Sequence, residues 1–326
     1  MSRLTGVLLV GGASRRFGSP KALARFRGET LAERGRRLLA ETCDEVLVVG
    51  KADELPGLPF PVVDDGADDR APVHGLVEGL RRAAHDVVVA LPVDNPLVTP
   101  GALRALGEAG AVPSGRIPLP GAYPRSLLAV LEERIAAGQI SLRGVNPVTL
   151  ALPEALLADA DTPEELEALA RPGHVVVVGG TGMLLGATRA LARRGHRVTS
   201  LARRPTDVGD GVVPAAVDYR ASDALEEALA RAVAERGPLE LALCWIHADA
   251  PDAPAIVAEA LAPGGRLVQV FGTRRWPLAP VPLRIAYREV LLGAVGGRWL
   301  THDEIAAGVL DAIDADAPCR AVGVRG

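Results

Sequence analysis

Residues 8–23 read LLVGGASRRFGSPKAL, a strand-like apolar run that leads into a glycine turn and then into a loop rich in cations. Because Gly11 and Gly12 carry no side chains, the backbone there can pass close to a bound group. The next helix cannot begin before Pro20, so we expect an irregular loop over residues 13–19. Open parallel α/β sheets bind ligands at the carboxyl ends of their strands, which makes this loop a candidate ligand site.

The loop combines two arginines with a lysine in a chain that contains 34 arginines and two lysines. A lysine retained in such a composition indicates a role for a compact ammonium group that a planar guanidinium would not fill. Together, Arg15, Arg16 and Lys21 would neutralise a triphosphate, and backbone N–H groups would add directional contacts. For the arginines alone, a solvated basic loop is the open alternative. The loop lacks the order G-x-x-x-x-G-K-[ST] and is therefore not a Walker A motif.

Composition excludes several classes of function. The formal net charge of −4 and the aromatic content of 3% argue against a nucleic-acid partner or an anionic membrane surface. Every apolar run is interrupted by charges, Gly or Pro, so we expect no membrane segment. The cysteines are odd in number and lack CxxC spacing, which favours a reducing cytoplasm over a disulfide scaffold or zinc site. The number of subunits stays open, with a homodimer as one option.

The order of predicted elements indicates two α/β domains in tandem. Strand-like runs at 6–10, 45–50, 60–64 and 86–93 alternate with helix-like stretches, as in a parallel sheet. After residues 161–173 the series restarts with a second strand and glycine turn. We therefore predict two tandem doubly wound, mostly parallel three-layer α/β domains of the Rossmann-like, nucleotide-binding type, over 1–171 and 172–326.

Four ordered segments resemble one known family. The pattern GGASRRFGSPKAL is similar to the first motif of the nucleotidyltransferases that include molybdenum cofactor guanylyltransferase. The later segments VVDD (62–65) with APVHGLVEGL (71–80), LPVDNPLVTP (91–100) and LADADTPEELEAL (157–169) resemble further motifs of that family in the same order. The resemblance covers about half of the chain.

The resemblance implies a set of site residues. It places Leu9, Val10 and Gly11 against the guanine and ribose of GTP, Lys21 on the phosphates and Asp65 near the nucleoside. It also implies Asp94 as the ligand of Mg²⁺. From its charge in the first loop, we assign Arg16 to catalysis as a second cation. The remaining residues of the first turn that we assign to nucleotide binding are Gly12, Ser14 and Arg15.

Asp94 also follows from its position in the sequence. It comes directly after an apolar strand and before Pro96, so its carboxylate emerges at the carboxyl end of the sheet, beside the first loop. A hard oxygen ligand suits Mg²⁺, which binds one or two carboxylates together with phosphate oxygens. The alternatives are a helix-capping or turn role for Asp94 and a solvated loop position for Asp65. Arg70 and Arg125 are weaker candidates for contacts with a cofactor phosphate.

The implied reaction needs no protein nucleophile. A phosphate on a molybdopterin-type acceptor attacks the α-phosphorus of a nucleoside triphosphate and displaces pyrophosphate, with Mg²⁺ and the cations holding the charge. Two departures from the family pattern leave GTP against CTP open, although GTP is favoured. The turn reads Gly18-Ser19-Pro20-Lys21 instead of G-x-D-K, and Gly50 replaces a frequent asparagine.

The second glycine turn, within residues 174–205, resembles the short-chain dehydrogenase/reductase fold. It opens a strand–turn–helix unit in which the helix N-terminus would hold a pyrophosphate. The second strand ends in Arg203 and Arg204, which would suit the 2′-phosphate of NADP. The residues that we assign to this dinucleotide are Gly179, Thr181, Gly182, Gly186, Arg203, Arg204 and Asp218. The alternative is that the glycines only permit tight packing of the helix on the strand.

The second domain lacks the usual catalytic pair of that fold. Residues 172–326 contain no lysine, and Leu291 stands four positions after Tyr287, so a Tyr-x-x-x-Lys pair is missing. We predict a nucleotidyltransferase with an appended dinucleotide-binding module whose turnover is open. Two alternatives remain, an NADP-dependent oxidoreductase with a degenerate first half, and a nucleotide-sensing protein without turnover.

Overall fold

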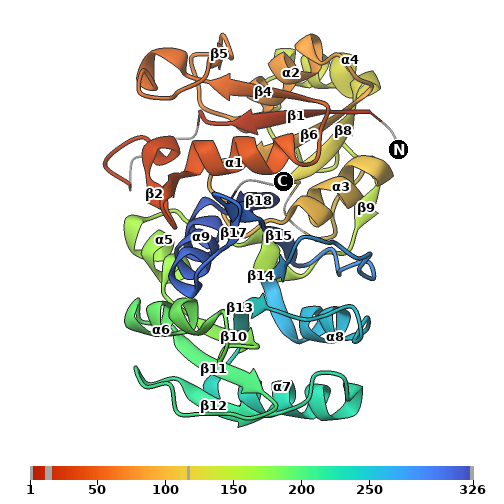
Figure 1. The fold of residues 1–326 in the computed structure, drawn as a ribbon. Helices are drawn as coiled ribbons and strands as arrows, with labels where there is room; N and C mark the ends of the chain where they lie inside the picture. The colour runs from red at the N-terminus through yellow and green to blue at the C-terminus, as the bar shows by residue number, and fades with distance from the viewer. Residues whose placement is uncertain (1–2, 12–16, 116–117, 324–326) are drawn as a thin grey trace. The chain divides into compact units, whose positions relative to one another are not determined.

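The computed structural model describes residues 3–11, 17–115 and 118–323, and the chain divides into two compact units (Figure 1). Unit 1 comprises Met1–Ala170 and unit 2 comprises Arg171–Gly326. In both, strands alternate with helices along the chain. The described part of the chain contains no helix long and apolar enough to cross a membrane.

Unit 1 is built on a five-stranded sheet in the order β5-β4-β1-β6-β8. β1 (Leu4–Leu9) lies at its centre and pairs in parallel with β4 (Glu45–Gly50) and β6 (Val87–Pro92). β5 (Val63–Asp64) extends the parallel part, and β8 (Gly121–Pro124) closes the other edge antiparallel to β6. The strand order reverses between β1 and β6, which is where such sheets open to a ligand.

Helices cover both faces of this sheet. α1 (Leu31–Ala40) and α3 (Pro100–Ala109) share a core with the even-numbered side chains of β1. α2 (Pro72–Arg82) and α4 (Leu128–Ala136) share a core with the odd-numbered ones. The short elements of unit 1 are η1 (Lys21–Leu23), β2 (Arg25–Phe26), β3 (Glu29–Thr30), η2 (Ala52–Glu54), β7 (Val112–Pro113), η3 (Arg125–Leu127), β9 (Thr149–Leu150), η4 (Glu154–Leu157) and α5 (Pro163–Ala170).

Unit 2 has a seven-stranded parallel sheet in the order β12-β11-β10-β13-β14-β15-β18. The first six strands follow the order 3-2-1-4-5-6 that binds dinucleotides, and β18 adds a seventh. The strands are β10 (His174–Val178), β11 (Arg197–Ala202), β12 (Val213–Ala216), β13 (Leu239–Cys244), β14 (Leu261–Phe271), β15 (Ala286–Leu292) and β18 (Cys319–Val322). One face carries α6 (Leu185–Arg193) and α9 (His302–Ala315), and the other carries α7 (Ser222–Arg236) and α8 (Ala253–Ala260). A small hairpin of β16 (Ala294–Val295) and β17 (Arg298–Trp299) precedes α9.

The predicted fold class is confirmed, and both sheets are mostly parallel with helices on both faces. The stretch 22–42, predicted as a helix with a lead-in, becomes helical only at Leu31, because Arg27 and Gly28 adopt positive φ angles in the turn of a β2–β3 hairpin. The last helix, α9, begins with a defined N-cap. Thr301 accepts a hydrogen bond from the backbone of Glu304 and completes a capping box.

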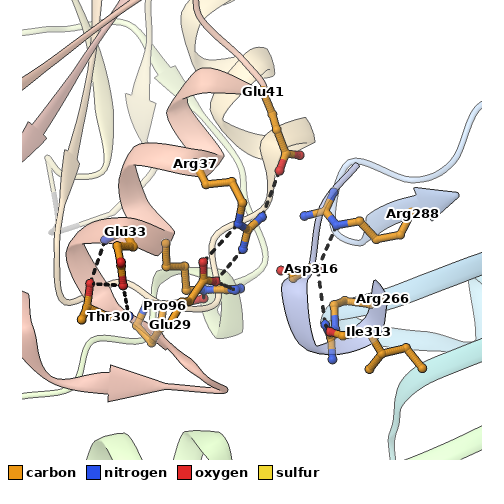
Figure 2. A network of polar contacts seen from close by, with 11 residues as sticks. Glu29, Thr30, Glu33, Arg37, Glu41, Pro96, Arg266, Arg288, Ile313 and Asp316 are labelled. Carbon is orange, nitrogen blue, oxygen red and sulfur yellow. Dashed lines mark hydrogen bonds and ion pairs between the residues drawn. The ribbon is translucent and has the colours of Figure 1, made fainter. Parts of the chain in front are cut away.

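A polar network ties α1 to the loop that follows β6 (Figure 2). The buried Arg34 donates from Nε to the carbonyl of Pro96 at 2.7 Å and from Nη1 to Glu29 at 3.1 Å. Arg37 bonds the same Glu29 and also Glu41. The network therefore fixes both the β2–β3 hairpin and the loop after β6 against one helix.

Figure 2 also shows a buried charge cluster within unit 2. Arg288 of β15 donates from Nε to Asp316 at 2.8 Å, and Arg266 of β14 lies 3.3 Å from the same carboxylate oxygen. Asp316 ends α9 in the left-handed conformation, with φ of 48°. Two guanidinium groups thus hold this residue in a backbone conformation that few side chains adopt.

Close approach of helices to β1 depends on glycine. A Cβ at Gly35 of α1 would stand 2.5 Å from Cδ1 of Leu8, and one at Gly79 of α2 would stand 2.6 Å from Cγ2 of Val7. Real Cβ atoms do not approach other atoms this closely. The two helices therefore lie at a distance from β1 that only glycine allows at these positions.

We predict that Gly79→Ala lowers the free energy of unfolding by about 1–3 kcal/mol through overpacking. The helix propensity of alanine, worth about 1 kcal/mol over glycine, acts in the opposite direction. Chemical denaturation followed by circular dichroism measures the change. Gly57→Ala is the control, because a Cβ at Gly57 would meet no atom within 4 Å. Equal or higher stability of Gly79→Ala would contradict the packing argument.

Candidate active site

A cavity of about 580 Å³, partly open to solvent, lies in unit 1 where the strand order reverses. The ends of β1 and β6 meet there, and the backbone N–H of Val93 donates to the carbonyl of Leu9 at 3.1 Å. The lining residues are Leu9, Val10, Gly11, Lys21, Val49, Asp65, Arg70, Ala71, Pro72, Gly75, Pro92, Val93 and Asp94. The structure thus brings six of the predicted residues of unit 1 to one cavity, namely Leu9, Val10, Gly11, Lys21, Asp65 and Asp94.

Lys21 is the central charge at one end of this cavity. Lys21 is only 9% exposed. Its Nζ donates hydrogen bonds to Asp94 Oδ2 at 3.1 Å and to Asp161 Oδ1 at 2.6 Å. Lys21 opens the 3₁₀ turn η1, with Pro20 directly before it, as expected from the sequence. An ammonium group and two carboxylates from distant parts of the chain therefore meet in one cluster.

The segment that carries Asp161 is attached to the loop after β6. Asn95, which is 7% exposed, donates from Nδ2 to the carbonyl of Leu157 at 3.1 Å. The backbone N–H of Ala160 donates to the carbonyl of Asp94 at 3.1 Å. Asp161 then precedes α5, where the Glu165 carboxylate accepts from its backbone N–H at 2.7 Å. These bonds hold Asp161 and Asp94 on either side of Lys21.

Lys21 only partly compensates the effect of burial on the pKa of Asp94. Burial disfavours the charged form of Lys21, but its hydrogen bond to Asp161 and the charge of Asp94 outweigh this, and the pKa of Lys21 lies above its ordinary value. Burial also raises the pKa of Asp94, and the attraction of Lys21 offsets this only in part. The carboxylate of Asp94 therefore lies in a place where a further cation would stabilise its charged form.

A second carboxylate, Asp65, lines the same cavity. Its Oδ2 lies 3.4 Å from the position that a Cβ on Gly11 would occupy. A Cβ on Gly50 would stand 2.7 Å from the backbone nitrogen of Gly11. Gly50, which stands where the family frequently has asparagine, thus lies where the backbone of the chain passes close to Gly11. Arg70 also lines the cavity and forms an ion pair with Glu54.

Four predicted residues, Gly12, Ser14, Arg15 and Arg16, lie outside the described residues. Sequence analysis missed three residues of this site, Asp161, Asn95 and Lys51, the last of which donates from Nζ to Asp65 Oδ1. Asp161 stands in the DTPEEL segment that carried part of the family resemblance, and Lys51 is the second lysine of the chain. The family segment around Asp161 and the scarcity of lysine could therefore have pointed to Asp161 and Lys51.

Unit 2 has its own cavity at the carboxyl ends of its strands, with a volume of about 1130 Å³ that includes open solvent. Of the predicted residues, Gly179, Thr181, Gly182, Arg203 and Arg204 line it. The other lining residues are Leu201, Ala202, Tyr219, Trp245 and His247. The rings of Trp245 and His247 pack edge to face, with their centroids 5.3 Å apart. The cavity combines a glycine turn and two arginines with an aromatic wall that the sequence analysis did not identify.

Two predicted residues of unit 2 are not among the lining residues of this cavity. Gly186 lies where α6 meets α9, and a Cβ there would stand 2.7 Å from the Cβ of Ala306. Asp218 accepts a hydrogen bond from the backbone of Arg220 at 3.1 Å in the turn before α7. In the structure, Gly186 serves helix packing and Asp218 serves the turn.

Comparison with known proteins concerns mainly the first half of the chain. Residues 6–146 match the model of the MobA-like NTP transferase domain. The chain is 34% identical over 155 residues to a protein of Chloroflexus aggregans described as "probable molybdenum cofactor guanylyltransferase", a match that covers 43% of this chain and 74% of that protein. A protein of Opitutus terrae with the same description is also 34% identical over 155 residues and is covered to 77%. The family match confirms the resemblance of the first three sequence segments, which lie within residues 6–146.

Two solved structures are each similar to about half of the chain. A protein of Aquifex aeolicus VF5 is 29% identical, with a TM-score of 0.41, and the match covers 48% of this chain and 92% of that one. A short-chain dehydrogenase/reductase from Serratia marcescens is 16% identical, with a TM-score of 0.37, and the match covers 48% and 96%.

We predict that Asp94→Asn changes how stability depends on pH. Because the pKa of Asp94 is raised in the folded state, the folded chain binds its proton more tightly than the unfolded chain does. The free energy of unfolding therefore falls as pH rises from the ordinary pKa of Asp94 through its raised pKa. The variant lacks this fall, so its stability relative to the wild type increases across this window.

Thermal melts between about pH 3 and about pH 7 would measure the difference. Lys21 stays protonated throughout this range, so the change of the difference with pH reports the ionisation of Asp94. Asp53→Asn, at an exposed position, is the control. A constant difference between Asp94→Asn and the wild type over this range would contradict the assignment.

Proposed function

Because the chain belongs to the MobA-like NTP transferase family through residues 6–146, we propose that unit 1 transfers a guanylyl group from GTP to a molybdopterin-type cofactor. An oxygen of the acceptor phosphate attacks the α-phosphorus, the bond from that phosphorus to the β-phosphate oxygen breaks, and pyrophosphate leaves. The observation that carries the proposal is the cluster of Lys21, Asp94 and Asp161 at the switch point of the sheet.

The ammonium of Lys21 binds the phosphates and stabilises the charge that moves onto the departing pyrophosphate. Asp161 does not line the cavity; its bond to Lys21 orients Nζ toward Asp94 and the open side. Asp65 lies at the nucleoside end. Positioning and charge stabilisation by these residues account for catalysis without a covalent intermediate.

The residues fit a divalent cation that arrives with the nucleotide. No group of three or more His, Cys, Asp or Glu side chains able to hold a metal occurs among the described residues, so a complete protein cage is not provided there. Mg²⁺ needs only one or two carboxylates when phosphate oxygens and waters complete its octahedron. Asp94, with its raised pKa and a side chain 27% exposed, would hold it. Bound there, Mg²⁺ would neutralise phosphate charge.

We expect Lys21→Ala to lower kcat/KM for GTP by about 100- to 1,000-fold, because a preorganised charge on the phosphates is lost. Lys21→Arg restores only part of the activity, since the guanidinium is too broad for a pocket shaped around an ammonium. Pyrophosphate release with GTP, Mg²⁺ and a pterin acceptor measures both. The control is Arg82→Ala, an exposed cation paired with Glu78. Unaltered release by Lys21→Ala would refute the site.

For unit 2 we propose that the cavity binds NADP(H). The glycine turn at Gly179 and Gly182 leaves the backbone accessible to a pyrophosphate, and Arg203 and Arg204 at the end of β11 suit a 2′-phosphate. Tyr287, the residue nearest to a catalytic tyrosine in the sequence pattern, lies on β15 and donates to Glu289 at 3.2 Å. Burial and then the charge of Glu289 raise the pKa of Tyr287, which makes it a poor proton donor. We therefore propose binding without standard hydride transfer.

In this second proposal, Arg203→Ala and Arg204→Ala weaken NADPH binding by about tenfold each, and NADH binding by less than twofold, since only NADPH carries the 2′-phosphate. Enhancement of NADPH fluorescence on binding measures the affinities. Arg231→Ala, at an exposed site on α7, is the control. NADPH consumption with a carbonyl substrate and no pyrophosphate release from any triphosphate would instead support an NADP-dependent oxidoreductase.

A further inference from the structure

The second lysine of the chain lies behind the other carboxylate of the unit 1 cavity. Lys51 directly follows β4, and its Nζ donates to Asp65 Oδ1 and to the carbonyl of Ala67. The backbone N–H of Ala67 donates to the same Oδ1 at 3.1 Å. Asp65 lines the cavity whereas Lys51 does not. Lys51 can therefore act on a ligand only through Asp65.

These bonds fix the direction of the Asp65 carboxylate. Its side chain is only 5% exposed, and that of Lys51 is 15% exposed, so both are held among protein atoms. Oδ1 accepts hydrogen bonds from Nζ of Lys51 and from the backbone N–H of Ala67. Oδ2 is directed at Gly11, where it lies 3.4 Å from the position of a Cβ. An ionised carboxylate is an acceptor only.

Guanine matches such an acceptor better than the other bases. Its N1–H and N2–H₂ donors are adjacent on one edge, and the two lone pairs of the remaining oxygen, Oδ2, accept from both. The amino groups of cytosine and adenine adjoin a ring nitrogen that is an acceptor, and the N3–H of uracil lies between two carbonyls. A fixed carboxylate therefore attracts guanine and opposes these three edges.

Resting on the proposed guanylyl transfer, we propose that Lys51 is a positioning residue that sets the base specificity of unit 1 by holding Asp65 for the N1–H and N2–H₂ donors of guanine. Loss of the ammonium frees the carboxylate to rotate toward solvent. The consequence is confined to recognition of the base, because Lys21 and Asp94 hold the phosphate end.

The test compares GTP with ITP, which keeps N1–H and lacks the N2 amine, in the full-length chain with Mg²⁺. Calorimetric titration of the wild type should give a Kd for GTP at least about tenfold lower than for ITP and for CTP, because the site is built to bind both donors. In Lys51→Met the ratio of the ITP and GTP values should fall to within about twofold, because GTP loses the contacts of both donors whereas ITP loses only that of N1–H.

Two further variants guard against a structural effect. Asp65→Asn replaces an acceptor by a donor and should likewise abolish the preference for GTP over ITP. Arg82→Ala removes an exposed cation and should leave the ratio at its wild-type value. The melting temperature of each variant is measured in parallel, and a general loss of structure would weaken GTP and ITP alike.

The inference is overturned if Lys51→Met keeps the wild-type ratio, or if the wild type discriminates against 2′-deoxy-GTP and not against ITP, which would assign Asp65 to the ribose. In either case pyrophosphate release from GTP would leave the proposed function intact. If the wild type neither binds a triphosphate nor releases pyrophosphate, the proposed function and this inference fail together.

Discussion

The ion pairs of Lys21 decide how unit 1 is assembled around its cavity. One ammonium group joins Asp94, 73 positions later in the chain, to Asp161, 140 positions later. The segments that carry the two partners are also joined directly, since Asn95 donates to the carbonyl of Leu157 and Ala160 donates to the carbonyl of Asp94. The lysine therefore closes a ring of contacts that includes the first and the last segments of the unit.

Such a cluster is poised for polyphosphate and not for stability alone. A buried carboxylate whose pKa is raised costs folding free energy, and the Asp94 side chain bears this cost at the wall of a cavity. The buried pair Arg288 and Asp316 of unit 2 differs, because it lines neither the cavity at the Gly179 turn nor any strand terminus and instead holds the end of α9. Similar charges thus serve binding in one unit and architecture in the other.

The sequence was sufficient for the fold class and for selecting six residues that the structure brings to one cavity, because both depend on local patterns, namely strand periodicity and glycine turns. It was insufficient where a contact joins distant segments. Sequence analysis did not single out Asp161, because its bond to Lys21 crosses 140 positions of the chain. The rarity of lysine pointed to Lys21 and applied equally to Lys51. Gly186 fitted a dinucleotide motif, yet its missing side chain makes room for Ala306.

The composition of the chain gives its cavity an unusual chemical property. Both side-chain amines of the 326 residues, on Lys21 and Lys51, bond carboxylates that line one cavity, and both are largely shielded from water. Acylating reagents that modify lysine elsewhere on protein surfaces therefore meet ε-amino groups only at this site. Covalent labelling of those ε-amines, and its suppression by a bound molecule, would report occupancy of this one cavity without interference from other lysines.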